Sequence, residues 1–171
     1  ALNGDRYLEV FYAVPWANGI FVPLNVRLTP PELIFMLNDS GAELLILDDA
    51  FTALLPEFND KLTSVKHILY AGNQDPPKGT TDLEALLSTC AAIPDAERGG
   101  EEIAGIFYTG GTTGLPKGAM LTHNNMVSNT LHILGYMYRG QHWIWPHTAP
   151  MFYLADSSMA HVVTTLAGTH L

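Results

Sequence analysis

The sequence predicts an α/β fold in which helices flank a layered, mainly parallel sheet. Two observations lead to this class. Short continuous apolar runs, typical of strands covered on both faces, alternate along the chain with longer segments of helical pattern. Strands that alternate with helices favour parallel pairing, because the helix carries the chain back across the sheet. The length of 171 residues allows one domain or a large piece of one.

Capping signals mark where the predicted helices begin. Thr29 precedes Glu32 by three residues, which is the spacing of a capping box, and Thr81 and Glu84 repeat it. Thr122 is the expected cap of a later helix. The predicted helices cover residues 5–17, 30–40, 49–59, 82–90, 123–138 and 154–167.

The predicted strands are short apolar runs bounded by turn residues. The first is IFVPL, which follows Gly19, the stop signal of the first helix. Loop composition separates the later runs, most clearly in AGNQDPPKGT at 71–80. The predicted strands cover residues 20–24, 43–48, 65–70, 103–108 and 117–121.

Composition and charge exclude several classes of protein. The net charge of −9 argues against a nucleic-acid partner, because a phosphate backbone demands a basic face. The single cysteine, Cys90, rules out an intramolecular disulfide and a cysteine-rich zinc site. No signal peptide opens the chain, and no apolar run reaches the roughly 18 residues of a membrane span. We therefore expect a cytoplasmic protein.

The stretch IFYTGGTTGLPKGAMLTH at 106–123 contains the strongest candidate site. Its glycines allow positive φ and close approach of the backbone to a ligand, and successive N–H groups in such a turn can bind an anion. Its threonines supply hydroxyl groups, and one lysine supplies a positive charge suited to phosphate. The candidate binding residues are Thr109, Gly110, Gly111, Thr112, Thr113, Gly114 and Lys117.

Other interpretations of this loop explain less. A flexible surface turn accounts for the glycines but for neither the cluster of threonines nor the pair Pro116–Lys117. A Walker A loop requires glycine directly before the lysine and serine or threonine after it, whereas this lysine stands between Pro116 and Gly118. A G-x-G-x-x-G fingerprint opens a helix, whereas a strand is predicted here.

The segment YTGGTTGLPKGAMLTH at 108–123 resembles the phosphate-binding signature of the AMP-forming adenylating enzymes. NGDRYLEVFYAVPWANGIFVPLN at 3–25 and APMFYLA at 149–155 look like segments of their acyl-CoA synthetase branch, the fatty-acid–CoA ligases. The resemblance implies that residues 1–171 are an incomplete piece of the large N-terminal, AMP-binding domain of such a ligase, without its C-terminal domain.

The resemblance also implies a two-step reaction. A carboxylic acid, expected to be aliphatic, attacks the α-phosphate of Mg-ATP to give an acyl adenylate and pyrophosphate, and a thiol, usually coenzyme A, then takes the acyl group. Lys117, Thr112, Thr113 and the backbone amides of the loop would stabilise the departing pyrophosphate. Thr109 would help to hold Mg²⁺.

Tyr153 is a departure from the family pattern, because relatives of this branch usually carry histidine at this position of APMFYLA. By resemblance, the residue lies near the acyl carboxylate. Tyrosine keeps a hydrogen-bond donor, so we expect its hydroxyl to orient the acid. The alternative is that the ring only packs in the core.

Two further readings of the function remain. One is a non-catalytic homologue that binds a nucleotide or a protein partner, and the other is an adenylating enzyme whose acceptor is not coenzyme A. The resemblance also predicts that the 171-residue chain is inactive by itself, since family elements for adenine, ribose and metal binding are not found in it. Unpaired strand edges could join two copies into a homodimer.

The histidines give a weaker signal. His142 and His147 are five residues apart, as are Asp156 and His161, and this spacing fits neither helix neighbours nor a zinc motif. We interpret these pairs as incidental and His123 as a helix-start residue.

Overall fold

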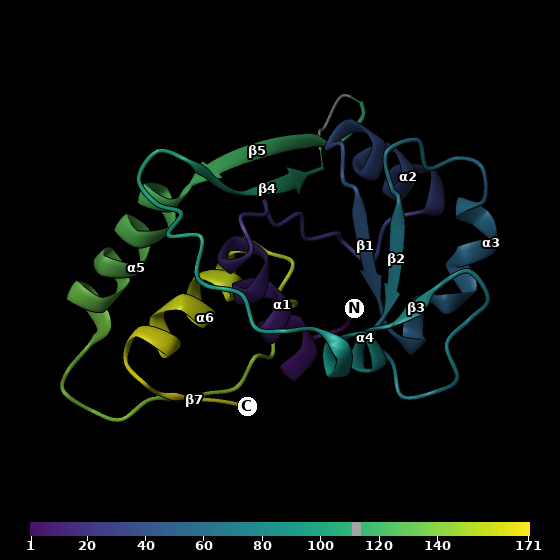
Figure 1. The fold of residues 1–171 in the computed structure, drawn as a ribbon. Helices are drawn as coiled ribbons and strands as arrows, with labels where there is room; N and C mark the ends of the chain where they lie inside the picture. The colour runs from purple at the N-terminus through teal and green to yellow at the C-terminus, as the bar shows by residue number, and fades with distance from the viewer. Residues whose placement is uncertain (111–113) are drawn as a thin grey trace. The chain divides into compact units, whose positions relative to one another are not determined.

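The computed structural model describes residues 1–110 and 114–171, which form two compact units (Figure 1). Each unit is assembled from separate stretches of the chain. Unit 1 contains residues 1–2, 24–94 and 108–118, and unit 2 contains residues 3–23, 95–107 and 119–171.

Unit 1 is built around a parallel sheet of three strands in the order β1 (Leu44–Leu47), β2 (His67–Tyr70) and β3 (Thr81–Asp82). This parallel pairing confirms the predicted α/β class. Its helices are α2 (Pro30–Asp39), the 3-10 helix η1 (Asp49–Leu54), α3 (Leu55–Phe58) and α4 (Leu83–Thr89). Its buried core consists of Leu33, Leu37, Leu45, Leu47, Phe58 and Tyr70.

The predicted cap of α2 is confirmed and that of α4 is wrong. The Thr29 backbone N–H donates to Glu32 Oε2 at 2.8 Å, as a capping box requires. At α4 the cap is Asp82, whose Oδ1 accepts from the backbone N–H of Ala85 at 2.6 Å. The aspartate is a good cap in its own right, so the helix begins one residue later than the threonine spacing predicts.

The single helix predicted over residues 49–59 is also wrong. The segment is a 3-10 helix followed by one α-helical turn, with Pro56 at the beginning of that turn. Proline has no N–H to donate and its ring clashes with the preceding turn, so a continuous α-helix cannot pass through this position.

Unit 2 contains three longer helices, most of one pair of strands and a second, short pair (Figure 1). In Figure 1, α5 and α6 lie side by side. The short strands β6 and β7 pair in parallel. β4 and β5 pair with each other, and their residues 108–109 and 117–118 belong to unit 1. The elements are α1 (Asp5–Trp16), β4 (Ile103–Thr109), β5 (Lys117–Thr122), α5 (His123–Met137), β6 (Ile144–Trp145), α6 (Leu154–Thr165) and β7 (Thr169–His170).

The strand predicted over residues 20–24 is reduced to one bridge. Phe21 pairs in parallel with Gly105, and its backbone N–H and C=O bond to Ala104 and Ile106. Pro23 has no N–H with which to continue the ladder, so the pairing ends there.

In the described residues the strands form three small sheets, whereas the sequence predicted mainly one. Two of these sheets are parallel, in keeping with the prediction. Only residues 110–116 separate β4 from β5, which is shorter than the dozen or more residues of a crossover connection, so the two strands are not a strand–helix–strand unit. No helix among the described residues is long and apolar enough to cross a membrane.

Candidate functional site

The glycine-rich loop joins β4 to β5, and the ends of these two strands hold its described residues. Thr109 is the last residue of β4 and Lys117 is the first of β5, and both are exposed. Gly110 and Gly114 are exposed. The backbone of Gly114 has a φ of +156°, which residues other than glycine rarely adopt. The other three predicted binding residues, Gly111, Thr112 and Thr113, lie outside the described residues.

Tyr108 anchors the strand end that leads into the loop. Its hydroxyl donates to Asp39 Oδ2 at 2.6 Å, at the C-terminal end of α2. Burial and then this carboxylate raise the pKa of Tyr108, so the phenol keeps its proton and the bond persists at neutral pH. The loop therefore starts from a fixed point in unit 1.

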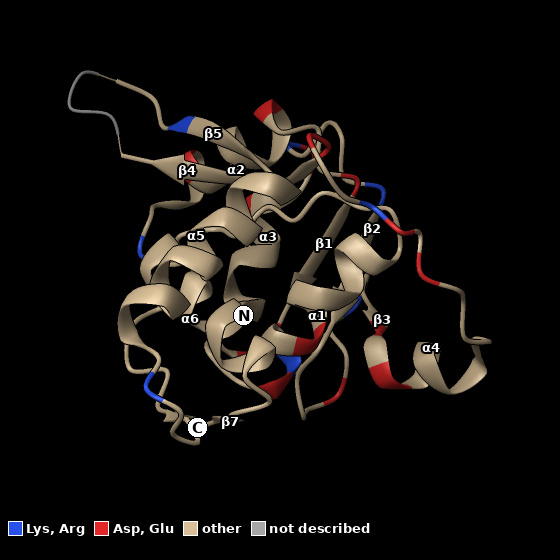
Figure 2. Ribbon diagram, turned by 90° about the vertical axis from the view of Figure 1, so that its left-hand side faces the viewer, with Lys and Arg blue, Asp and Glu red and all other residues tan. Residues whose placement is uncertain are grey.

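Lys117 is an exposed cation at the other end of the loop. Among residues 1–110 and 114–171, no acidic side chain forms an ion pair with it. Figure 2 shows that basic residues are few and scattered along the ribbon, and that one of them stands at the beginning of β5. An uncompensated lysine beside a glycine-rich loop is free to meet an anionic ligand.

The described residues fit a magnesium ion only in part. Thr109 offers a hydroxyl oxygen, which is a hard ligand suited to Mg²⁺. No group of three or more His, Cys, Asp or Glu side chains that could hold a metal occurs in the part of the chain that the structure describes. Magnesium usually binds through one or two carboxylates together with substrate phosphates, so Thr109 could supply only one of several ligands.

Tyr153 belongs to unit 2, at the N-cap of α6, whereas the loop belongs to unit 1. Its side chain is 43% exposed and packs against Phe152, with ring centroids 4.3 Å apart. It makes no capping bond to the helix. The phenol is therefore accessible, although its role stays a prediction.

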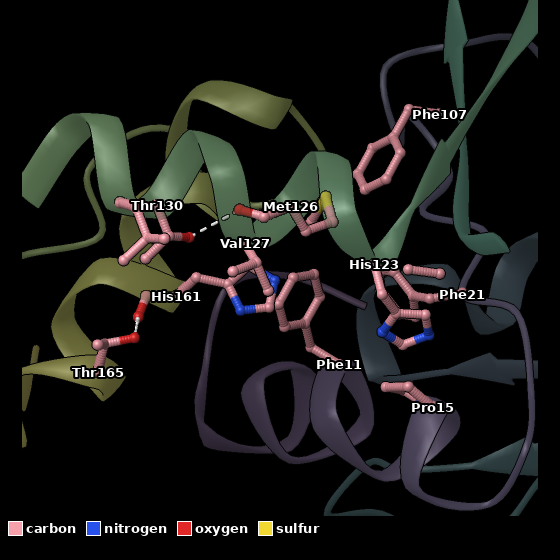
Figure 3. Close-up of a pocket in the computed structure, with 12 residues that line it drawn as sticks. Phe11, Pro15, Phe21, Phe107, His123, Met126, Val127, Thr130, His161 and Thr165 are labelled. Carbon is pink, nitrogen blue, oxygen red and sulfur yellow. Dashed lines mark hydrogen bonds between the residues drawn. The ribbon is translucent and has the colours of Figure 1, made fainter. Parts of the chain in front are cut away.

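Unit 2 also contains a pocket of about 210 Å³ between α1, β4, α5 and α6 (Figure 3). Apolar side chains dominate its walls, among them Phe11, Phe21, Phe107 and Met126. The hydroxyls of Thr130 and Thr165 point back to helix carbonyls, as the dashed lines in Figure 3 show.

Two imidazoles also line this pocket. The His161 ring lies against Phe11 with centroids 4.9 Å apart, and Nε2 of His123 is buried without a hydrogen-bond partner among the described residues. Burial, with the nearby His123, lowers the pKa of His161 to about 4. His123 is the first residue of α5, as predicted, and Thr122 caps this helix.

We expect His161 to make the protein less stable in mild acid. The unfolded chain takes up the His161 proton near pH 6.5, whereas the folded chain does so only near pH 4, so stability falls as the pH drops through this window. From pH 7 to pH 5 the loss attributable to His161 is about 2 kcal/mol. Urea unfolding at both pH values measures it.

The variant His161→Gln should lose about 2 kcal/mol less than the wild type between pH 7 and pH 5. Thr165→Val, which changes the same pocket without removing a titrating group, should retain the full loss. An equal loss in the wild type and in His161→Gln would contradict the assignment.

The structure joins two residues that the sequence pattern did not pair. His147 Nδ1 lies 2.7 Å from Asp156 Oδ2, and both side chains are buried. The spacings considered in the sequence were His142 with His147 and Asp156 with His161, and both were interpreted as incidental. The two partners are nine residues apart on a loop and a helix, and no periodicity in the sequence signals such a contact.

A family model and similar proteins point to the same family. The family model described as AMP-binding enzyme matches residues 1–171. The chain is 35% identical over 97% of its length to a feruloyl-CoA synthase of an Amycolatopsis species, and 28% identical over 99% of its length to 4-hydroxybutyrate–CoA ligase 2 of Metallosphaera sedula. It covers 31% and 32% of these proteins, about a third of their length.

A solved structure agrees with these relatives. ATP-bound MatB from Rhodopseudomonas palustris matches 99% of this chain with a TM-score of 0.82 and 25% identity. The match covers 33% of MatB.

Proposed function

Because this chain belongs to the AMP-binding enzyme family, we propose that it is part of the N-terminal domain of an ATP-dependent acyl-CoA synthetase. The whole protein activates a carboxylic acid as acyl-AMP and transfers the acyl group to coenzyme A. The observation that carries the proposal is the loop between β4 and β5, with an exposed Lys117 at its end that forms no ion pair within the described part of the chain. The names of its relatives, which are CoA ligases, support the same reaction class.

In this proposal the loop acts on the phosphates of ATP. Negative charge develops on the departing pyrophosphate when the acid attacks the α-phosphate. Lys117, the loop amides and the hydroxyls of Thr112 and Thr113 would stabilise that charge, because a cation and hydrogen-bond donors lower the energy of a developing anion. Tyr108, hydrogen-bonded to Asp39, holds the end of β4, the strand that leads into the loop.

Magnesium is proposed to enter with the triphosphate. Thr109 would contribute its hydroxyl oxygen, and ATP itself would contribute phosphate oxygens. Bound Mg²⁺ would supply neutralisation of the developing phosphate charge.

The acid is proposed to be aliphatic. Of the two relatives named above, one acts on 4-hydroxybutyrate and the other on ferulate, so aliphatic and aromatic acids are both represented in the family. A panel that contains butyrate, 4-hydroxybutyrate, octanoate, palmitate and ferulate therefore tests the substrate class directly.

Two assays on the full-length protein that contains this chain test the function. ATP–pyrophosphate exchange that depends on an added acid supports adenylation, and formation of acyl-CoA identifies coenzyme A as the acceptor. Nucleotide binding without exchange for any acid would instead favour the non-catalytic homologue. Exchange without acyl-CoA would favour an adenylating enzyme with another acceptor.

We expect the 171-residue chain by itself to form no measurable acyl adenylate. It contains the phosphate loop, but the loop alone cannot hold ATP and the acid in a reactive geometry. The measurement is acyl-AMP formation by the purified chain, with the full-length protein as the positive control. Adenylate synthesis by the chain at a rate near that of the full-length protein would contradict this expectation.

We expect Tyr153→Phe to slow acid activation about 5- to 10-fold in the full-length protein, the equivalent of one lost hydrogen bond of about 1 to 1.5 kcal/mol. The residue is 43% exposed, which leaves its phenol open to the hydrogen bond that this proposal assigns to it. The measurement is acid-dependent pyrophosphate exchange, together with thermal stability. Tyr136→Phe, at an 81% exposed tyrosine of α5, is the matched control and should behave as wild type. A wild-type rate for Tyr153→Phe would leave the residue with a packing role only.

A further inference from the structure

A chain of hydrogen bonds runs through unit 2 and ends three residues after Tyr153. It begins at Tyr12 on α1, whose hydroxyl lies 2.8 Å from Thr164 Oγ1 on α6. Thr164 Oγ1 lies 3.1 Å from His170 Nε2 on β7, and His170 Nδ1 lies 2.8 Å from His147 Nε2. His147 Nδ1 then meets Asp156 Oδ2 at 2.7 Å, in the first turn of α6.

The direction of these bonds follows from the donors and acceptors. An ionised Asp156 can only accept, so His147 carries a proton on Nδ1. Thr164 Oγ1 accepts from Tyr12 and can give its own proton to His170 Nε2. His170 then donates from Nδ1 to His147 Nε2. Every bond points towards Asp156, so neighbouring bonds polarise one another in the same sense.

Burial makes this arrangement costly to break. The side chains of His147 and Asp156 are 8% and 4% exposed. The planes of the two imidazole rings differ by only 6°, with centroids 5.1 Å apart, as a hydrogen bond between their ring nitrogens favours. Loss of either partner would leave a buried polar group without its bond.

Titratable groups that face the network are Tyr7 and Tyr12 from α1 and His170 from β7. Burial lowers the pKa of His170, with a further contribution from His147, which favours the neutral ring that can accept from Thr164. Burial and then the charge of Asp156 raise the pKa of Tyr7, which stays protonated. No competing charge from these groups opposes Asp156.

Further hydrogen bonds, with Leu171 and Asn3, hold the segment that leads from His147 to Tyr153. The His147 backbone N–H donates to the carbonyl of Leu171 at 2.8 Å. The side-chain amide of Asn3 donates to the carbonyls of His147 and Ala149, and its oxygen accepts from the N–H of Met151. Residues 147–151 are therefore held on both sides, and Tyr153 follows at the helix cap.

We propose that Asp156 and His147 are positioning residues that hold Tyr153 in place to orient the carboxylic acid. This inference rests on the proposed function. Asp156 lies in the first turn of α6, where a helix N-terminus favours a negative charge. Its carboxylate bonds to His147 and does not cap the helix. The bond ties the first turn of α6 to the preceding loop, and the Tyr153 phenol remains free for the substrate.

The kinetic test uses Asp156→Asn and Thr164→Val in the full-length protein. Asp156→Asn keeps the size and removes the charge, and we expect kcat/KM for the acid to fall at least about 10-fold, because a displaced orienting group is costly. KM for ATP and acyl transfer from preformed adenylate should not change. The control Asp95→Asn removes an exposed carboxylate from the same unit and should behave as wild type.

Thr164→Val guards against a folding defect, because Thr164 is exposed and valine has the same shape. It removes the link between Tyr12 and His170, and we expect a fall of about 2- to 5-fold in kcat/KM for the acid. Thr89→Val, at an exposed helical threonine of unit 1, is the matched control. Wild-type kinetics in both Asp156→Asn and Thr164→Val would overturn the proposal.

A double-mutant cycle separates positioning from general destabilisation. If Asp156 acts through Tyr153, the double variant Asp156→Asn/Tyr153→Phe should be slowed by less than the product of the two single effects. Effects that multiply fully would show that the two residues act independently, which would overturn the proposal.

Nitrogen NMR of the imidazoles supplies a readout that needs no activity. We expect both His147 and His170 to carry their proton on Nδ1 in the wild type, and a proton on Nε2 of neutral His170 would overturn the bond chain. If the wild type activates no acid in the panel, the proposed function fails. The spectrum still shows whether the chain of hydrogen bonds has the direction given above. If the wild type is active but Asp156→Asn is unaffected, only this inference fails.

Discussion

Replacing Lys117 with methionine in the full-length protein is expected to slow the adenylation half-reaction about 10²- to 10³-fold, the usual cost of one lost contact to a developing negative charge. Lys117 is exposed at the start of β5 and has no acidic partner among the described residues, so its charge is available to the departing pyrophosphate. Pyrophosphate leaves only in the first half-reaction. Acyl transfer from preformed adenylate should therefore proceed at close to the wild-type rate.

The two half-reactions are measured separately, by single-turnover formation of acyl-AMP and by thioester formation from acyl-AMP. Lys78→Met is the matched control, because Lys78 is another exposed lysine in a loop of unit 1. It lowers the net charge by the same amount and should leave both steps intact. Equal slowing of the two half-reactions by Lys117→Met would count against a role in pyrophosphate departure.

Replacing Gly111 with valine is expected to weaken ATP binding about 10- to 100-fold while the fold survives. A β-branched side chain disfavours positive φ and would push the loop backbone away from the phosphates. Loss of one charge-assisted bond from the backbone, worth about 1.5 to 3 kcal/mol, gives an effect of this size. Equilibrium titration with ATP measures it, and thermal unfolding tests the fold.

Gly79→Val is the control for backbone strain without a phosphate contact. Gly79 has a φ of +88° and open space around it, in a loop of unit 1 away from the signature sequence. The variant Gly79→Val should lower the stability of the protein slightly and leave its affinity for ATP unchanged. If Gly111→Val bound ATP as tightly as the wild type, the glycine-rich segment would be a connecting loop and not a binding element.

Local sequence predicted most of the helices and strands in the described residues. α1, α2, α5 and α6 lie within two residues of their predicted bounds, because each has an apolar pattern with a cap or a stop at its ends. Two of the failures occur at prolines. Pro56 interrupts a helix and Pro23 ends a strand after one bridge, because each removes a backbone donor at a position where the pattern alone continues.

The candidate site, too, was predicted only in part from local sequence. Lys117 and the glycines are close in sequence, so an ordered local signature was enough to propose a phosphate loop, and the structure sets the described part of it between β4 and β5. The anchor of that loop was not predictable. Tyr108 and Asp39 are 69 residues apart, and each looks like an ordinary strand or helix-end residue until the fold brings them together.

The sequence by itself determined the α/β class, the family signature and the position of the proposed phosphate loop, because all three depend on spacing within a short window. Only the tertiary structure paired His147 with Asp156 and extended that pair to His170, Thr164 and Tyr12. Their partners come from different elements, so no period of 2 or 3.6 residues links them. The physical reason is burial: polar side chains removed from water must find one another, and which ones meet depends on the packing of α1, α6 and β7 around the loop that carries His147.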